Sequence, residues 1–268
     1  MLSQIASQLQ PLAGTIAPLA GEATEALQAL SQMGYRAVQL SSTQVGTRPR
    51  DLDGSGRKDL MVQMRKLGLA CAGLDLWIPS SHFVDSVFID RALNAVTQSI
   101  ILAASLGRCS VSIALPEQTD QNKDRLRNVR EAIQTAAQHE GIWIADHGLD
   151  AATGKWSCES SSFLGIGIDP PMLMAAGHDV SDRVALLGRS IVTARIVDLL
   201  RSGMRGPPDE PGNSRLDFQA YAATLASLPL RTSPVADARQ WSDPRAGLRA
   251  TIERWTGDVT QCTRLHME

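Results

Sequence analysis

The sequence has few of the residues that build disulfide frameworks, metal clusters or membrane spans. Its 268 residues include four cysteines and five histidines. The cysteines show no C-x-x-C pairing, so we expect reduced thiols in a cytoplasmic protein. No apolar run is long enough to span a bilayer, and we expect no secretory signal, because the first basic residue is Arg36. The formal net charge of -2 provides no overall basic field for nucleic acid or an anionic membrane.

The chain instead alternates short β-type runs with amphipathic helices. The hydrophobic share of 43% is enough for a sizeable core. Several helices end at a glycine that is followed by an apolar run, which is typical of parallel strands joined by helices. The predicted strands span residues 5–9, 36–40, 69–76, 109–115, 142–146, 164–169, 191–197 and 235–238. The predicted helices span residues 22–33, 59–67, 90–106, 124–139, 171–176, 217–228 and 244–255.

Eight units of about 30 residues each predict an α/β fold, the (β/α)8 TIM barrel, as a single domain over residues 1–268. A doubly wound open sheet is the alternative, but it usually has about five or six strands. In a barrel the ligand site lies at the carboxyl ends of the strands. Two long loops, 41–57 and 201–215, follow strands and are therefore expected on that face.

Several segments resemble the sugar phosphate isomerase/epimerase family, the xylose isomerase-like barrels. They include EALQALSQMGYRAVQL, MRKLGLACAGLDL, IWIADH, GIGIDPPMLMAAGHD and TARIVDLL. The resemblance extends over nearly the whole chain. It implies an isomerase or epimerase that acts on, or binds, a sugar, sugar phosphate or related polyol at the mouth of the barrel.

The family also implies a divalent metal (Mn, Mg or Zn) held by a Glu, an Asp, a His and a Glu at the ends of strands five to eight. In this sequence the corresponding residues are Ala145, Asp169, Arg195 and Asp237. Ala145 has no donor atom, and Arg195 stays protonated and repels a cation. Asp169 and Asp237 remain as candidate metal ligands, and we expect no tightly bound metal.

The same residues form the candidate catalytic set. Isomerisation needs a base beside a carbonyl group and an electrophile that stabilises the enediolate. Asp169 or Asp237 is the candidate base, and Arg195 or a weakly bound metal is the candidate electrophile. The alternative is that Arg195 pairs with one of the two aspartates and only holds the barrel together.

Candidate substrate-binding residues follow other strands. Tryptophans suit the C–H faces of sugars, and although aromatic residues make up only 4% of the chain, five of them are Trp. Trp77, Trp156 and Trp241 each come just after a predicted strand. We expect a carbohydrate or an anionic ligand to be bound by Trp77, Trp241, Glu117, His147, Asp198 and Arg201.

Three functions are compatible with this fold. The first is a sugar isomerase or epimerase. The second is a catalytically inactive relative that binds a sugar-like or anionic ligand, or a protein partner, without metal; the missing ligands favour it. The third, a DNA-repair endonuclease, needs a dense set of metal ligands and a basic face, which the few histidines and the net charge of -2 argue against.

Overall fold

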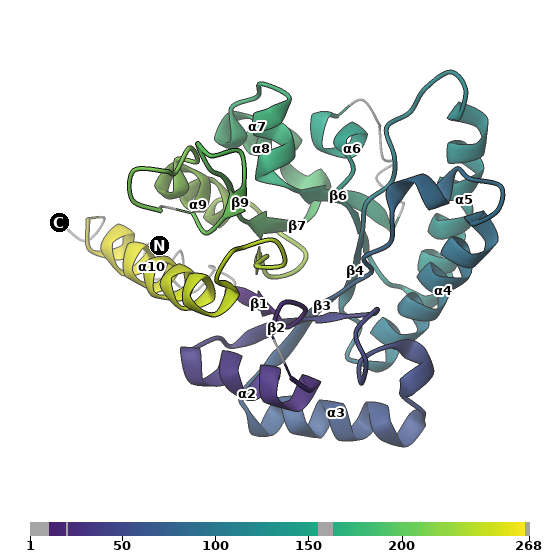
Figure 1. Ribbon diagram of the computed structural model, residues 1–268, viewed down its shortest axis with the longest axis horizontal. Coiled ribbons are helices and arrows are strands. Elements are labelled where there is room, and N and C mark those ends of the chain that lie inside the picture. Colours follow the sequence, from purple (N-terminus) through teal and green to yellow (C-terminus); the bar gives the residue numbers. More distant parts are fainter. Residues whose placement is uncertain (1–10, 20, 155–162, 209, 266–268) are drawn as a thin grey trace.

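The computed structural model describes residues 11–19, 21–154, 163–208 and 210–265, with side chains as far as residue 257. Eight parallel strands close into a barrel in the order β1-β10-β7-β6-β5-β4-β3-β2 (Figure 1). Their bounds are β1 Ala13–Thr15, β2 Ala37–Ser41, β3 Ala70–Asp75, β4 Ser110–Ile113, β5 Ile144–Asp146, β6 Leu164–Ile168, β7 Ile191–Ile196 and β10 Val235–Ala236. The predicted (β/α)8 barrel is confirmed.

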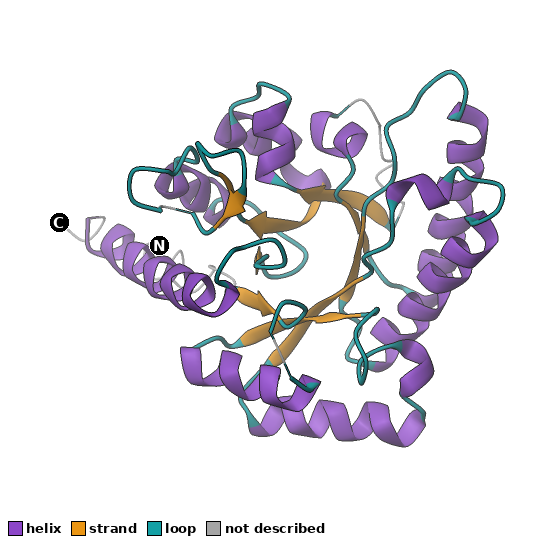
Figure 2. Cartoon of the chain, in the orientation of Figure 1, coloured by secondary structure: helices purple, strands orange, loops and turns teal. Residues whose placement is uncertain are grey.

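Helices surround the barrel, as the purple ribbons of Figure 2 show. Their bounds are α2 Ala23–Met33, α3 Gly54–Lys66, α4 Ile89–Ser105, α5 Lys123–Glu140, α6 Leu149–Thr153, α7 Pro170–Ala175, α8 Val180–Leu187, α9 Phe218–Ala226 and α10 Pro244–Leu265. Short 3-10 turns lie at Pro49–Asp51, Ser80–Phe83 and Gly188–Ser190. None of the helices in the described part of the chain is long and apolar enough to cross a membrane.

The helix-to-strand junctions follow the predicted pattern. Gly34 and Gly141 adopt φ angles of 101° and 66° immediately after α2 and α5. Glycine takes this left-handed conformation without steric cost, which lets the chain turn back toward the barrel. α2 and α5 therefore return to the parallel strands β2 and β5 after short connections.

The first strand was predicted in the wrong place. The predicted run 5–9 lies outside the described residues, and the barrel is completed by Ala13–Thr15. Three residues of sequence AGT carry almost no periodic signal. Gly14 is needed here because a Cβ atom would lie 2.6 Å from Leu30 Cδ2, on the helix that covers the strand.

Three features had no counterpart in the prediction. Helix α6 follows β5, where no helix was predicted. Helix α8 is a second helix in the sixth unit, and a small antiparallel hairpin follows β7. The hairpin pairs β8, Asp198–Leu199, with β9, Arg205–Gly206. It folds the first part of the long 201–215 loop back against the end of β7.

The strands are buried on both faces, as expected for a parallel sheet covered by helices. Ile113, Ile166 and Ile168 are each at most 3% exposed and belong to one continuous hydrophobic core. All five residues of β6 are buried. Polar residues replace this apolar pattern at the carboxyl ends of the strands, where the candidate site lies.

Candidate functional site

Arg195, in β7, lies among three carboxylates that come from the ends of other strands. Its Nη1 is 2.6 Å from Oδ2 of Asp169, which follows β6. Its Nε is 3.2 Å from Asp237, after β10, and its Nη2 is 3.6 Å from Asp75, the last residue of β3. All four residues are at most 6% exposed. The guanidinium therefore occupies the middle of the barrel mouth.

Two further arginines complete this arrangement. Arg239 donates from Nε and Nη2 to the two carboxylate oxygens of Asp237, at 2.7 and 2.5 Å, and from Nη1 to Asp75. Arg205, in β9, lies 3.0 Å from Asp169. We call these residues the mouth cluster: Asp75, Asp169, Asp237, Arg195, Arg205 and Arg239. Three positive charges match three negative charges, which is how buried charges become tolerable.

Burial and the guanidiniums act in opposite directions on the pKa values of Asp237 and Asp75. Burial by itself raises the pKa of Asp237, but Arg239 and Arg195 outweigh it and hold that pKa well below its ordinary range. At Asp75 the balance is reversed: burial raises the pKa, although Arg239 and Arg195 act against it. Asp237 is therefore a carboxylate at neutral pH and a weak base.

His147 lies in the same end of the barrel, directly after β5. It is 1% exposed. Its Nδ1 is 3.2 Å from the carbonyl oxygen of Ile168, and its Nε2 is 3.2 Å from the hydroxyl of Ser112. Burial, with the charges of Arg195 and Arg239, holds the pKa of His147 well below its ordinary value. The imidazole is therefore neutral, with Nδ1 donating to the carbonyl oxygen.

A glycine makes room for this imidazole. A Cβ atom at Gly167 would lie 2.5 Å from the His147 ring. On the other side, Gln39 donates to the Ser112 hydroxyl at 3.3 Å. Asp146 takes no part, because its Oδ1 accepts from the backbone of Leu115 and Gly148. The sequence motif Asp146-His147 thus supplies one structural carboxylate and one histidine of the barrel mouth.

The other predicted binding residues are spread more widely. Asp198 is buried, and its carboxylate accepts from the Ser214 hydroxyl and from the backbone of Arg215 and Leu216, so it holds the 201–215 loop. Glu117 is exposed in the loop after β4. Arg201 is exposed between the two strands of the hairpin. Ligand contacts by these residues stay predictions.

The predicted ligand-binding tryptophans differ in their exposure and in the residues they contact. Trp77, just after β3, is 51% exposed, and the guanidinium carbon of Arg239 lies 4.0 Å from its ring centroid. Trp241 is 5% exposed and packs in the hydrophobic core against Gly247 of α10. Trp156 lies outside the described residues. Trp77 thus presents an aromatic surface next to the mouth cluster.

Three members of the mouth cluster, Asp75, Arg205 and Arg239, were not among the predicted site residues. A weak signal exists for Asp75, because it interrupts an apolar run at the end of β3. Arg239 comes two residues after Asp237 in a stretch of no regular structure. Neither signal predicts that these two residues, 164 positions apart, form a hydrogen bond.

The donor set does not fit the metal that the family resemblance implies. A divalent cation needs several free oxygen or imidazole donors around one point. Here guanidiniums bind Asp75, Asp169 and Asp237, and the buried Ala145 offers no ligand. Residues 11–19, 21–154, 163–208 and 210–265 include no group of three or more metal-binding side chains.

Comparison by sequence finds no match, either to a family model or to a curated protein. Solved structures do match over almost the full chain. L-ribulose 3-epimerase has a TM-score of 0.74 at 16% identity, with 97% of both chains covered.

Two other solved structures match to a similar extent. A xylose isomerase domain protein from Alicyclobacillus acidocaldarius has a TM-score of 0.73 at 17% identity, covering 94% of this chain and 98% of that one. The IolI protein, solved with a bound zinc atom, has a TM-score of 0.69 at 14% identity, covering 93% and 98%. The chain therefore has the fold of the xylose isomerase-like TIM barrels, among which are sugar epimerases.

Proposed function

We propose that this barrel binds a small polyhydroxylated ligand at its mouth without a divalent metal. The observation that carries the proposal is the position of Arg195, whose guanidinium contacts Asp169, Asp237 and Asp75 at 2.6 to 3.6 Å. A fixed positive group fills the centre of the site and also neutralises the carboxylates that a cation would need. The protein is then a sugar-binding barrel in which metal-dependent isomerisation is lost.

The chemistry around Arg195 supports a polyol as the ligand. Guanidinium N–H groups donate and carboxylate oxygens accept, and a hydroxyl group can pair with either. The half-exposed ring of Trp77 offers a flat surface for the C–H face of a sugar. The structurally similar L-ribulose 3-epimerase acts, by its name, on a sugar.

A metal-independent isomerase or epimerase is the second candidate. One observation favours it: carboxylates and guanidiniums lie side by side, as a base and an electrophile would. It ranks second because the contacts that fix Asp237 also hold its pKa well below the ordinary range. Such a carboxylate is a poor base for removing a proton beside a carbonyl group.

Calorimetric titration with ketopentoses and ketohexoses, with and without EDTA, tests the proposal. We expect saturable binding that EDTA does not change. Trp77→Ala should weaken sugar binding about tenfold, because one aromatic contact with the ligand is lost. Val87→Ala is the matched control, because Val87 is an exposed apolar residue outside the mouth cluster. Binding that disappears with EDTA would contradict the proposal.

Product analysis separates the two candidates. NMR of each sugar incubated with the metal-free protein should show one unchanged species. An epimer or isomer that accumulates without metal would favour the second candidate, provided that Asp237→Asn abolishes its formation.

A further inference from the structure

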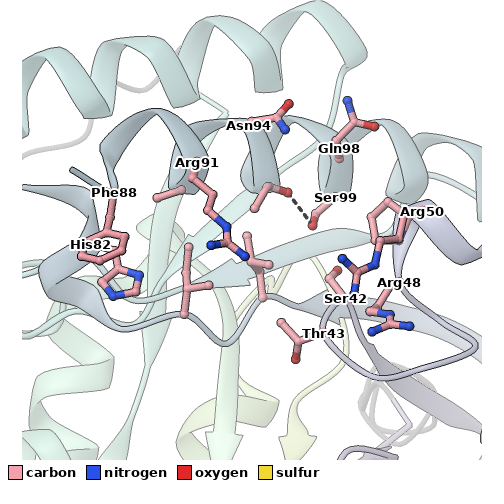
Figure 3. Close-up of a pocket in the computed structure, with 15 residues that line it drawn as sticks. Ser42, Thr43, Arg48, Arg50, His82, Phe88, Arg91, Asn94, Gln98 and Ser99 are labelled. Atoms are coloured by element: carbon pink, nitrogen blue, oxygen red, sulfur yellow. Dashed lines mark hydrogen bonds between the residues drawn. The ribbon is translucent and has the colours of Figure 1, made fainter. Parts of the chain in front are cut away.

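A pocket lies outside the mouth cluster, between α4 and the loops that follow β2 and β3 (Figure 3). Its volume is about 650 Å³, within the usual range for small-molecule sites. None of the six mouth-cluster residues lines it. The nearest link along the chain is Leu76, which lines the pocket and follows Asp75 directly. The pocket is therefore a separate candidate site on the same side of the barrel.

The charged residues that line the pocket are all basic. Three arginines line the pocket, and no aspartate or glutamate does. Arg48 and Arg50 come from the loop after β2, and Arg91 extends from α4 toward the loops, as Figure 3 shows. The adjacent Asp51 pairs with Arg48 at 2.8 Å and lies 4.0 Å from Arg50. One negative charge thus faces three positive ones.

The three arginines differ in how they are held. Two hydrogen bonds from Arg48 to Asp51, at 2.8 and 3.1 Å, fix its guanidinium. Arg91 has no ion pair within the described part of the chain. A guanidinium that is not already paired keeps its fork of donors free for a phosphate or carboxylate. Arg91 therefore supplies the positive charge most available to a ligand.

A buried hydroxyl adds a second, independent indication. Ser42 lines the pocket and is only 5% exposed. Its Oγ has no hydrogen-bond partner among the described residues. Its backbone is fixed, because its N–H donates to the carbonyl oxygen of Asp75 at 2.9 Å. A buried hydroxyl without a partner is costly, and a bound acceptor would relieve that cost.

Apolar side chains form part of the remaining wall, beside the polar Thr43, Asn94, Gln98 and Ser99. Leu76, Ile78 and Ala95 line the pocket, and the rings of His82 and Phe88 stack with centroids 4.4 Å apart. Arginines together with apolar walls suit a ligand that has an anionic group and a small organic body. Phosphate offers three acceptor oxygens, which match several guanidinium donors and one hydroxyl better than a planar carboxylate does.

We propose that this pocket is a second ligand site, which binds a phosphate-bearing small molecule through Arg91, Arg50 and the Ser42 hydroxyl. This site is independent of the polyol site proposed at the mouth. The two can therefore be tested separately on the same protein.

Titration calorimetry with phenyl phosphate, in a buffer without other multivalent anions, tests this assignment. We expect saturable binding that Arg91→Gln weakens about tenfold or more, as expected for losing a charge-assisted hydrogen bond. Arg249→Gln is the matched control, because Arg249 is an exposed arginine on α10 that does not line the pocket. Ser42→Ala should weaken binding by a smaller factor, and Trp77→Ala should leave it unchanged.

Three results would overturn the proposal. One is the absence of phenyl phosphate binding at millimolar concentrations. Another is a loss of phenyl phosphate affinity in Arg249→Gln that equals the loss in Arg91→Gln, which would mean non-specific attraction to surface charge. The third is benzoate binding as tightly as phenyl phosphate, which would refute the phosphate preference. The thermal unfolding temperature of the Arg91→Gln variant should match that of the parent protein, because Arg91 is exposed.

Discussion

Nη1 of Arg195 lies 2.6 Å from Oδ2 of Asp169, and this contact joins the ends of the adjacent strands β7 and β6. The backbone at Arg195 is fixed as well, since its carbonyl oxygen accepts from the buried hydroxyl of Tyr221 at 3.0 Å. Arg195 is therefore held both through its side chain and through its main chain. We therefore expect this guanidinium to affect both the stability of the barrel mouth and the ligands that bind there.

Arg195→Met should destabilise the protein by about 3 kcal/mol, because removing one partner leaves buried carboxylates without full compensation. Urea unfolding at pH 7 measures the loss. Arg249→Met, at an exposed site, should stay within about 0.5 kcal/mol of the parent. Equal effects of the two changes would mean that the mouth cluster contributes no more than surface charge.

Ala145→Glu combined with Arg195→His should create affinity for zinc or manganese. The double change adds two ligands beside Asp169 and Asp237 and removes a repelling charge. Calorimetric titration should show metal binding by the double variant and none in the micromolar range by the parent. Micromolar binding by the parent would make a metal-dependent isomerase the better account.

Protonation of His147 should make stability depend on pH. Its pKa is well below the ordinary value of 6.5 in the folded state, so the unfolded chain binds the proton more readily. Stability from this residue is present above that ordinary value and is lost as pH falls below it. The loss should be on the order of 1 kcal/mol by pH 5.5. Urea unfolding from pH 7.5 to 5.5 should show a steeper decline for the parent than for His147→Gln. Parallel declines would show that folding leaves the pKa of His147 unchanged.

Ile166→Ala should cost about 2–5 kcal/mol through lost burial and the cavity left behind. Ile166 is 3% exposed in β6. Leu186→Ala is the control, because Leu186 is 73% exposed and should change stability by less than about 0.5 kcal/mol. A loss below about 1 kcal/mol at Ile166 would be inconsistent with a core position in β6.

Local periodicity made most of the fold predictable. Apolar residues at helical spacing, a glycine, and then a short apolar run are features of neighbouring residues, and they recur along the chain. They predicted the barrel and seven of its strands to within a few residues. The exception is β1, whose residues Ala13, Gly14 and Thr15 form no strongly apolar run. Its position depends on packing against α2 and on pairing with β2 and β10.

The amino-acid sequence alone indicates the alternation of strands and helices, the absence of metal-binding side chains at positions 145 and 195, and the polar residues at the strand ends. Which of those residues meet depends on the folded chain. Closing the barrel brings Asp75 of β3 to Arg239, 164 residues later, and places Arg195 among three carboxylates. Such contacts depend on strand register and on the paths of long loops, which interactions between neighbouring residues do not fix. The physical reason is that ion pairing in a buried site is set by distance in space, whereas periodicity in sequence reports only which face of an element is buried.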